Sequence, residues 1–405
     1  MRLKVFAVII LMSLLTSCAT GVEKPIEATR ITSTLNPAYS LLSMVNAQNA
    51  TARLSALEAP RILAHTFLAA YAAYLAADDS MNRDYAAAKA GALVASTMHI
   101  DRVRANNILS IVDSFREGEH IQEDKLAISI SNNVLAIANN DGHADSITNY
   151  APKQGTTIYN WEPTGRGTYG LEPGWSKIQP LIKSSSNCVI PTPLEQQVRD
   201  EAIAMLKQYS VNDAVGQDVL WWLAGTGTPT PSGQWLNIAS NALRDKKLAT
   251  KDSLLTLTVA TIAASDAAIA GWREKYRHNL ARPETLWKIL EKDQTLIPVL
   301  PRETPPHPSY PSGHSVFGGA VTTVLKNAIG DSALRDTLPA DMYAPAQRRD
   351  WTSIDAALNE ASLSRIHAGF HMPMDTKAGE DLGSCVANAV LANYKELLKG
   401  VTNAK

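Results

Sequence analysis

The feature that most constrains the fold is a long stretch of helical periodicity at residues 251–279. Apolar residues recur there at spacings of three and four, which is the repeat of one face of an α-helix. Asp266 lies within this apolar stripe, where a structural carboxylate that accepts hydrogen bonds is commoner than a catalytic one. Ala-rich stretches at 55–77, 85–109 and 125–139 predict further helices, and β-branched runs are short. The sequence therefore predicts an all-α fold.

The change in residue composition along the chain indicates two helical bundles joined by a long irregular connection. Gly, Pro, Ser and Thr with isolated aromatic residues are frequent from 140 to 193, which is typical of a connection that runs over a surface. Residues 192–195, with the sequence TPLE, then predict a capping box with proline at the first helical position, opening a helix to about residue 210. We expect an N-terminal bundle with the connection at 36–190 and a C-terminal bundle at 191–400.

Composition excludes several classes of protein. With 45% hydrophobic and 19% charged residues, the chain can bury a sizeable core and is not disordered. Lys and Arg number 38 against 39 Asp and Glu, so the net charge of −1 gives no general attraction for nucleic acid. No later stretch reaches the roughly 20 apolar residues that span a bilayer, so we expect no transmembrane helix in the body of the chain. We expect small-molecule partners and no nucleic acid, and the oligomeric state is not indicated.

The N-terminus predicts export. Arg2 and Lys4 precede an apolar run at 5–15, which is too short to span a membrane and typical of a secretory signal. The sequence LTSC ending at Cys18 resembles the bacterial lipoprotein signal, in which the leader is cut before a cysteine that becomes lipidated. We therefore expect an exported bacterial lipoprotein, periplasmic or anchored to the outer membrane, with residues 1–18 as signal peptide and 19–35 as a polar tether. An ordinary secretory leader is the alternative.

The three cysteines are too few for a disulfide scaffold or a thiolate metal cluster. After export, Cys188 and Cys385 would lie in an oxidising compartment and are able to pair. Their separation along the chain says nothing about their distance in space, so the bridged and the free state both remain open.

Residues suited to binding an anion are concentrated between 275 and 375, where five of the nine histidines lie. Lys275 and Arg282 form the first of three groups. Seven positions are almost two helical turns, so both cations can lie on one helix face, and Pro283 then ends or bends the helix. Taken alone, this pair would be a solvated basic face.

The second group is Ser312 and Gly313, followed by His314 and the apolar segment 315–325. A Ser-Gly pair at the start of a helix offers a hydroxyl and bare backbone N–H groups, which together form a cradle for an anion. His314 would then lie at the rim of that cradle. In isolation, such a turn and cap would be structural.

The third group comprises Arg365, His371 and Asp375. An acid four positions after a histidine can fix the tautomer of its ring, and Arg365 adds a bidentate donor for an oxyanion. His367 and His371 also have the spacing of a zinc site. Ala368 stands where the HExxH motif has glutamate, however, and no third ligand is evident.

Together the three groups supply three cations, an anion cradle and two histidines. These groups suit a tetrahedral oxyanion that passes through five-coordination. One histidine would bond the central atom along the axis, and the other would move a proton at the opposite apex.

The three groups resemble the signature shared by the type 2 phosphatidic acid phosphatases (PAP2) and the vanadium-dependent haloperoxidases. The matching residues are Lys275, Arg282 and Pro283, then Pro311, Ser312, Gly313 and His314, then Ser364, Arg365, His371 and Asp375. Further segments resemble the haloperoxidase branch and bacterial haloperoxidase-related proteins, namely 161–164, 172–175, 228–235, 271–276 and 305–310.

The resemblance implies a PAP2/haloperoxidase-like helical catalytic domain that holds vanadate, or phosphate in the same site, and no haem. His371 would be the axial vanadate ligand or, in a phosphatase, the phosphorylated nucleophile. His314 would be the acid–base group, and Asp375 would orient His371. The equatorial oxygens would be bound by Lys275, Arg282, Ser312, Gly313 and Arg365.

The activity implied by the resemblance is oxidation of halide by hydrogen peroxide to hypohalous acid. A periplasmic acid phosphatase that hydrolyses phosphomonoesters through phospho-His371 is the first alternative, and an anion-binding lipoprotein without enzymatic activity is the second. An apolar pocket near Trp272 would favour the haloperoxidase, whereas a wide polar cleft beside His314 would favour the phosphatase.

Two further positions bear on the halide. Trp272 and His307 are candidate residues of a halide pocket. Algal bromoperoxidases have histidine and chloroperoxidases have phenylalanine where His307 stands, which favours bromide or iodide; a packing role for His307 is the alternative. Ala281 stands where many haloperoxidases carry a bulky aromatic residue, which predicts a more open halide side of the pocket.

Overall fold

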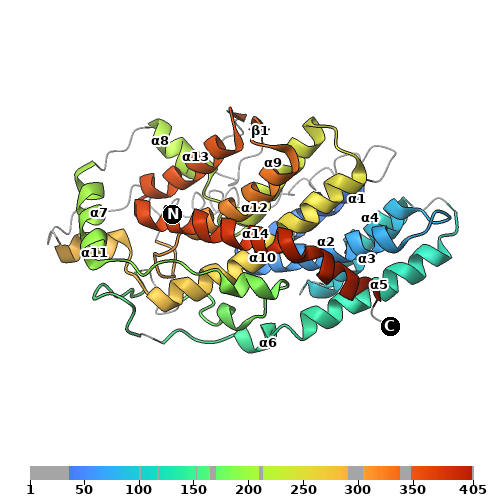
Figure 1. The fold of residues 1–405 in the computed structure, drawn as a ribbon, viewed down its shortest axis with the longest axis horizontal. Helices are drawn as coiled ribbons and strands as arrows, with labels where there is room; N and C mark the ends of the chain where they lie inside the picture. Colours follow the sequence, from blue (N-terminus) through green and yellow to red (C-terminus); the bar gives the residue numbers. More distant parts are fainter. Residues whose placement is uncertain are drawn as a thin grey trace, which may run out of the picture. The chain divides into compact units, whose positions relative to one another are not determined.

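Helices dominate the computed structural model, which describes residues 36–99, 102–115, 118–151, 153–164, 170–208, 213–290, 304–337 and 348–403 (Figure 1). The predicted all-α class is confirmed. Strands in these ranges are limited to a two-stranded antiparallel ladder of β1 (Leu334–Asp336) and β2 (Arg349–Trp351). The predicted signal peptide with Cys18 and the polar tether lie outside the described residues.

The first helices pack on one another through Ala-rich faces. They are α1 (Pro37–Thr51), α2 (Glu58–Ala76), α3 (Arg83–Met98), α4 (Arg102–Ser114) and α5 (Ile121–Asn139). The helices predicted at 55–77 and 125–139 are present as α2 and α5. The helix predicted at 85–109 is instead two helices, because the backbone adopts an extended conformation at His99. The His99 ring donates a hydrogen bond to the Asn49 side chain at 3.0 Å.

The connection from 140 to 193 is largely irregular in its described residues, as predicted. It contains only the short helices α6 (His143–Ser146), η1 (Trp175–Lys177) and η2 (Lys183–Asn187). The Asp266 carboxylate accepts hydrogen bonds from the backbone N–H groups of Leu181 and Ile182, at 2.8 and 2.9 Å, and from the Ser185 hydroxyl at 3.0 Å. Its predicted structural role is confirmed, because it ties this connection to the central helix.

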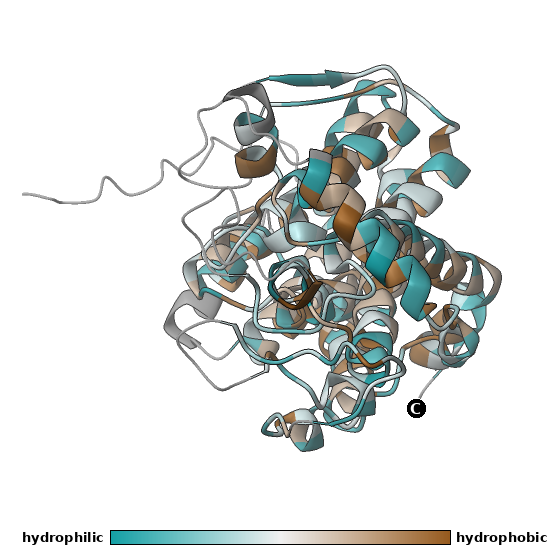
Figure 2. Ribbon diagram, turned by 90° about the vertical axis from the view of Figure 1, so that its left-hand side faces the viewer, coloured by the Kyte–Doolittle hydropathy of each residue, from teal (hydrophilic) through white to brown (hydrophobic). Residues whose placement is uncertain are grey.

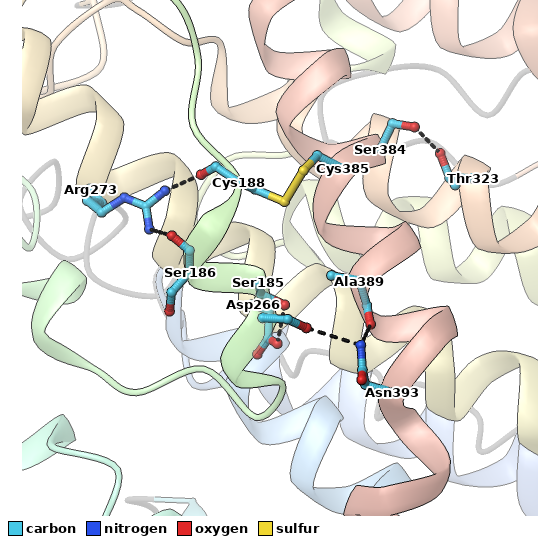
Figure 3. The surroundings of a disulfide bond; sticks show 11 residues. Ser185, Ser186, Cys188, Asp266, Arg273, Thr323, Ser384, Cys385, Ala389 and Asn393 are labelled. Atoms are coloured by element: carbon cyan, nitrogen blue, oxygen red, sulfur yellow. Dashed lines mark hydrogen bonds between the residues drawn. A yellow bond between two sulfur atoms is a disulfide. The ribbon is translucent and has the colours of Figure 1, made fainter.

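A disulfide between Cys188 and Cys385 settles the question that the sequence left open (Figure 3). It joins the end of the connection to the C-terminal helix α14 (Pro373–Asn403). Arg273 donates to the carbonyl oxygens of Ser186 (3.0 Å) and Cys188, so the same short segment is also bonded to the central helix. The connection is thus fastened from two sides.

The C-terminal half supplies the remaining helices. They are α7 (Glu195–Gln208), α8 (Asp213–Trp221), α9 (Thr230–Asp245), α10 (Thr250–His278), α11 (Pro283–Leu290), α12 (Gly313–Ile329), α13 (Ile354–His367) and α14. The predicted capping box is wrong, since α7 begins at Glu195 rather than at Pro193. The Glu195 carboxylate accepts the N–H of Ile158 at 3.0 Å, so a residue distant in sequence takes the acceptor that the box requires.

The central helix α10 packs against α2, α12 and α14. By length and composition it could cross a membrane, with a mean hydropathy of 1.6 over its most apolar window, so the expectation that no later stretch reaches this length is wrong. Since 94% of that window is buried inside the protein, its hydrophobicity is accounted for by core packing. The outer helices, in contrast, carry both hydrophilic and hydrophobic residues around their turns (Figure 2).

Glycines bring α12 and α14 into close contact. A Cβ at Gly383 would lie 2.2 Å from the Val316 carbonyl oxygen, and one at Gly319 would lie 2.4 Å from the Glu380 carbonyl oxygen. Only residues without a side chain allow the two backbones to approach this closely. Because the helices touch near their N-terminal ends, the segments that begin them are held side by side.

We predict that Gly383→Ala lowers the free energy of unfolding by about 1–3 kcal/mol, because the added methyl group meets backbone atoms that cannot rotate away. Gly400→Ala on the same helix is the matched control, since no atom lies within 4 Å of the position of its Cβ. That control should be neutral or stabilising by up to about 1 kcal/mol. Thermal or denaturant unfolding measures both, and equal stabilities of the two variants would contradict the close packing of α12 on α14.

Candidate functional site

Lys275 lies in the last turn of α10, whereas Arg282 lies in the connection that follows. α10 ends at His278 because Asn279 takes a left-handed conformation with φ 48°. The prediction that both cations share one helix face is therefore wrong. Both side chains are fully buried, which also rules out a solvated basic face.

Lys275 fastens the segment that leads into α12. Its Nζ donates to the carbonyl oxygens of Pro308 (2.8 Å), Ser309 (3.0 Å) and Pro311 (2.5 Å). Burial and the nearby Arg282 charge hold the pKa of Lys275 well below its usual value.

The Ser-Gly cradle begins α12 as predicted. Ser312 is the N-cap residue, and its hydroxyl accepts the N–H of Ser315 at 3.5 Å. A Cβ at Gly313 would lie 3.4 Å from the Trp272 ring and 3.8 Å from Lys275 Cε, so the glycine keeps open the space between them. The Ser312 N–H donates to the Asp375 carbonyl oxygen at 2.8 Å, which joins the cradle to the start of α14.

His371 lies in the turn between α13 and α14, and Asp375 lies in the first turn of α14. The His371 Nδ1–H donates to Asp375 Oδ2 at 3.1 Å, which fixes the tautomer and leaves the lone pair on Nε2. Arg282 Nη1 donates to that Nε2 at 3.0 Å. The same Asp375 oxygen also accepts the Met372 N–H (3.1 Å) and the Ser309 hydroxyl (2.5 Å).

Three buried cations meet here without a carboxylate partner. Lys275 and Arg282 are 0% exposed and Arg365 is 1% exposed. Their hydrogen-bond acceptors are backbone carbonyls, the Ser364 hydroxyl and histidine nitrogens, and none of them forms an ion pair within the described part of the chain. Burial lowers the pKa of Arg282 to about 10 and that of Arg365 to about 9. Buried charges of one sign are costly unless an opposite charge joins them, so this arrangement calls for an anion.

The site histidines are electrically neutral near pH 7. Burial, together with the Arg282 and Lys275 charges, holds the pKa of His371 well below its usual value. Burial and Arg365 do the same for His314. The Nε2–H of His314 donates to the Leu223 carbonyl oxygen at 3.1 Å.

A cavity of about 250 Å³ lies against this cluster. Six of the predicted or neighbouring site residues form part of its wall, namely Trp272, His307, Gly313, His314, Arg365 and His371. The rest of the wall is mainly apolar and includes Leu54, Leu171, Leu223, Pro305, Phe317 and Phe370. Lys275, Arg282, Ser312 and Asp375 do not line it and stand behind the wall.

His307 and Trp272 lie together at this cavity, with ring centroids 5.0 Å apart. His307 Nδ1 accepts a hydrogen bond from Arg282 Nη2 at 3.0 Å, so His307 contacts the cation that also reaches His371. Ala281 is fully buried and is not part of the cavity wall, and its N–H donates to the Tyr159 carbonyl oxygen. Ala281 thus packs beside the site, and the more open halide side that its small side chain predicts stays a prediction.

The zinc alternative is contradicted. α13 ends at His367, so His367 and His371 do not share a helix, and His367 lines a different depression with Asp218 and Glu360. Among the residues that the structure describes, no three His, Cys, Asp or Glu side chains could hold a metal ion together.

Sequence reasoning missed several residues of the site. The Ser309 hydroxyl donates a hydrogen bond to Asp375, and the Phe370 carbonyl oxygen accepts one from Arg282 Nη1 at 2.8 Å. Ser55 and Leu171 line the cavity. The positions of Ser309 and Phe370 beside the motifs offered a weak signal. Ser55 and Leu171 offered none, because they reach the site only through tertiary packing.

Glu274 organises the side of α10 next to Lys275. Its fully buried carboxylate accepts from Arg273 Nε (3.0 Å) and Arg277 Nε (3.0 Å), and His278 Nε2 lies 3.4 Å away. Burial alone would raise the pKa of Glu274, but the hydrogen bonds from His278, Arg277 and Arg273 lower it to about 2.

The comparisons with known proteins agree with this arrangement. Residues 288–400 match the family model of the second helical-bundle domain of vanadium chloroperoxidase (VCPO). The vanadium chloroperoxidase of Curvularia inaequalis is 24% identical over an alignment of 188 residues, and the match covers 35% of this chain and 31% of that protein. The matched part thus spans about a third of that relative's length.

Solved structures show the same fold. A bacterial vanadium-dependent iodoperoxidase superposes with a TM-score of 0.77 at 23% identity, covering 91% of this chain and 98% of the other. A bacterial vanadium-dependent chloroperoxidase in its holo form gives 0.67 at 13% identity, covering 86% and 94%. The resemblance to the vanadium-dependent haloperoxidases that the motifs indicated is confirmed by these similarities of sequence and fold.

We predict that Glu274→Gln lowers the free energy of unfolding by about 3 kcal/mol at pH 7. The folded-state pKa is depressed from 4.5 to about 2, so the stabilisation is present above pH 4.5 and is lost as the pH falls toward 2. Calorimetry from pH 7 downward should show the two proteins converging below about pH 4.5. Glu396→Gln, at an exposed pair with Lys399, is the control and should cost at most about 0.5 kcal/mol. A pH-independent difference would contradict the assignment.

Proposed function

We propose that this protein, which has the fold of the vanadium haloperoxidases, is a vanadate-dependent haloperoxidase that oxidises bromide or iodide with hydrogen peroxide to hypohalous acid. The observation that carries the proposal is the set of three buried cations that form no ion pair among the described residues, beside His371 Nε2, the unprotonated ring nitrogen, which accepts a hydrogen bond from Arg282 Nη1. Their charge calls for an oxyanion, and the nitrogen supplies a ligand for its central atom.

The donor set fits vanadate. Lys275, Arg282 and Arg365 would balance the negative charge of the anion, and the Ser312 hydroxyl and the Gly313 N–H would be further donors to it. His371 Nε2 would bind its central atom. When bound, vanadate supplies a Lewis acid that activates peroxide toward attack by halide.

The protein's own residues have distinct tasks in this reaction. Asp375 accepts the Nδ1 proton of His371, which keeps the Nε2 lone pair available and orients the ring. His314, on the cavity wall, would act as the acid–base group and move a proton to or from the bound reactants. The apolar wall excludes water and so strengthens each electrostatic contact with the bound anion.

The character of the cavity supports the haloperoxidase over the phosphatase, although both would bind their anion in the same cluster. Trp272 and His314 line the same mainly apolar cavity of about 250 Å³. Small apolar chambers suit halide and peroxide better than the polar body of a phosphomonoester.

Export is part of the proposal. We infer that the chain is anchored by a lipid on Cys18 in the periplasm or at the outer membrane. The disulfide between Cys188 and Cys385 supports this, because such bonds persist in oxidising compartments.

The first test uses protein lacking residues 1–18, assayed with and without orthovanadate for peroxide-dependent oxidation of bromide and iodide, and in parallel for hydrolysis of p-nitrophenyl phosphate. We expect vanadate-dependent halide oxidation that falls by at least about 10³-fold in His371→Ala. His367→Ala is the matched control and should keep the parent activity, since its ring lies outside the cavity. Phosphatase activity that vanadate inhibits, without halide oxidation, would overturn the proposal.

A second test addresses the halide. His307→Phe removes one of the two acceptors of Arg282 Nη2, the other being the Pro305 carbonyl oxygen, and makes the wall beside Trp272 more apolar. We expect the chloride-to-bromide ratio of kcat/KM to rise by about fivefold or more, equivalent to about 1 kcal/mol. His307→Gln keeps a polar side chain and should change the ratio less. An unchanged ratio in His307→Phe would show that His307 only packs.

A further inference from the structure

One polar group at the cavity has no task in the mechanism above. Ser55 lines the cavity, and its hydroxyl donates to Glu172 Oε2 at 3.1 Å. Leu171, the residue before Glu172, lines the same cavity. The Glu172 carboxyl group is therefore separated from the cavity by the Ser55 hydroxyl.

The segment that carries Glu172 is fixed to the site. The Leu171 carbonyl accepts hydrogen bonds from Trp272 Nε1 at 3.1 Å and from the Tyr276 hydroxyl at 2.8 Å. Its N–H donates to the Pro306 carbonyl at 2.7 Å. Glu172 itself has φ 47°, in the left-handed region that favours glycine, and strain of this kind is typical of functional positions.

The surroundings of Glu172 favour an exchangeable proton. Within the described residues Glu172 forms no ion pair, and the titratable groups that face it are Glu58, His143 and Tyr276. Burial and the Glu58 charge raise the pKa of Glu172 to about 7, against the opposing hydrogen bond from Ser55. His143 Nε2 and Glu58 Oε1 lie 2.7 Å apart, and the two side chains are 27% and 26% exposed. They therefore connect the surroundings of Glu172 with solvent.

We propose that Glu172 is a proton donor for halide oxidation and that it acts through the hydroxyl of Ser55. This inference rests on the proposed function. In the net reaction, hydrogen peroxide, a halide ion and one proton give hypohalous acid and water. The O–O bond breaks, an oxygen–halogen bond forms, and the halide loses two electrons to the peroxide oxygens. Each turnover thus consumes a proton that the cavity must receive from solvent.

The geometry provides a route for that proton. For the transfer, the Ser55 hydroxyl turns its hydrogen from Glu172 Oε2 toward the cavity, and Ser55 Oγ accepts the Glu172 carboxyl hydrogen in place of the backbone N–H of Leu57 or Glu58. The Ser55 hydrogen released into the cavity then ends on the departing water. Glu172 then regains a proton from solvent beside Glu58 and His143. His314 moves a proton at the reacting atoms, whereas Glu172 replaces the one that is consumed.

Glu172→Gln tests this role, because glutamine keeps the size and the hydrogen bonding but cannot release a proton. At pH 6 we expect kcat for bromide to fall at least about tenfold. The parent kcat should decrease as the pH rises through about 7, and this decrease should be absent in the variant. Imidazole added as an external acid should restore activity in proportion to its concentration. The Kd for orthovanadate and the Tm should stay close to those of the parent.

Companion variants separate chemistry from structure. Ser55→Ala should repeat the loss, whereas Ser55→Thr, which keeps a hydroxyl, and Glu172→Asp should retain most of the activity. The Ser55 hydroxyl also accepts the backbone N–H of Leu57 and Glu58, so the Tm is measured for both Ser55 variants. Glu162→Gln, a glutamate of the same connection that does not line the cavity, is the matched control and should behave as the parent.

The outcomes are distinguishable. A parent enzyme without vanadate-dependent halide oxidation overturns both this inference and the proposed function. An active parent together with a Glu172→Gln variant that keeps the parent pH profile overturns the role of Glu172 alone. A loss that imidazole does not restore and that accompanies a lowered Tm also overturns it, because it identifies Glu172 as structural.

Discussion

The structure of this site depends on burying more positive charge than the protein itself neutralises, since the three cations share the buried carboxylate of Asp375, whose charge acts on Lys275 and Arg282. Lys275, Arg282 and Arg365 are removed from water and bonded largely to backbone carbonyls, which hold their positions without cancelling their charge. Such an arrangement is costly in the absence of an anion and strongly favours one when it is present. The packing of the C-terminal helices offsets the free-energy cost of burying these cations.

Close helix contact supplies the required rigidity. α12 and α14 meet through glycines, so the Ser-Gly cradle at the start of one helix lies beside Asp375 at the start of the other. The disulfide and Asp266 fasten the irregular connection to α14 and α10. That connection in turn carries Leu171 and Glu172 to the cavity. Elements far apart in the sequence therefore hold one another around a small chamber.

Local patterns predicted the parts of the fold that local energetics control. The periodicity of α10 and the Ala-rich stretches of α2 and α5 identified these helices, because a buried face demands an apolar residue every three or four positions. The wrong predictions concern places where residues outside the motif decide the local structure. Ile158 takes the acceptor of the expected capping box, and Asn279 ends α10 before Arg282, so Arg282 reaches His371 from a loop.

The sequence by itself determined which groups take part in the site, because the spacing of the three motifs specifies cations, a helix N-terminus and a histidine with its carboxylate. The tautomer of His371 was also foreseeable, since an acid four positions on reaches Nδ1. Only the tertiary structure decided that Cys188 meets Cys385, that the cavity is mainly apolar, and that Ser55 and Leu171 belong to its wall. These contacts join residues far apart along the chain, and no local spacing encodes the packing that brings them together.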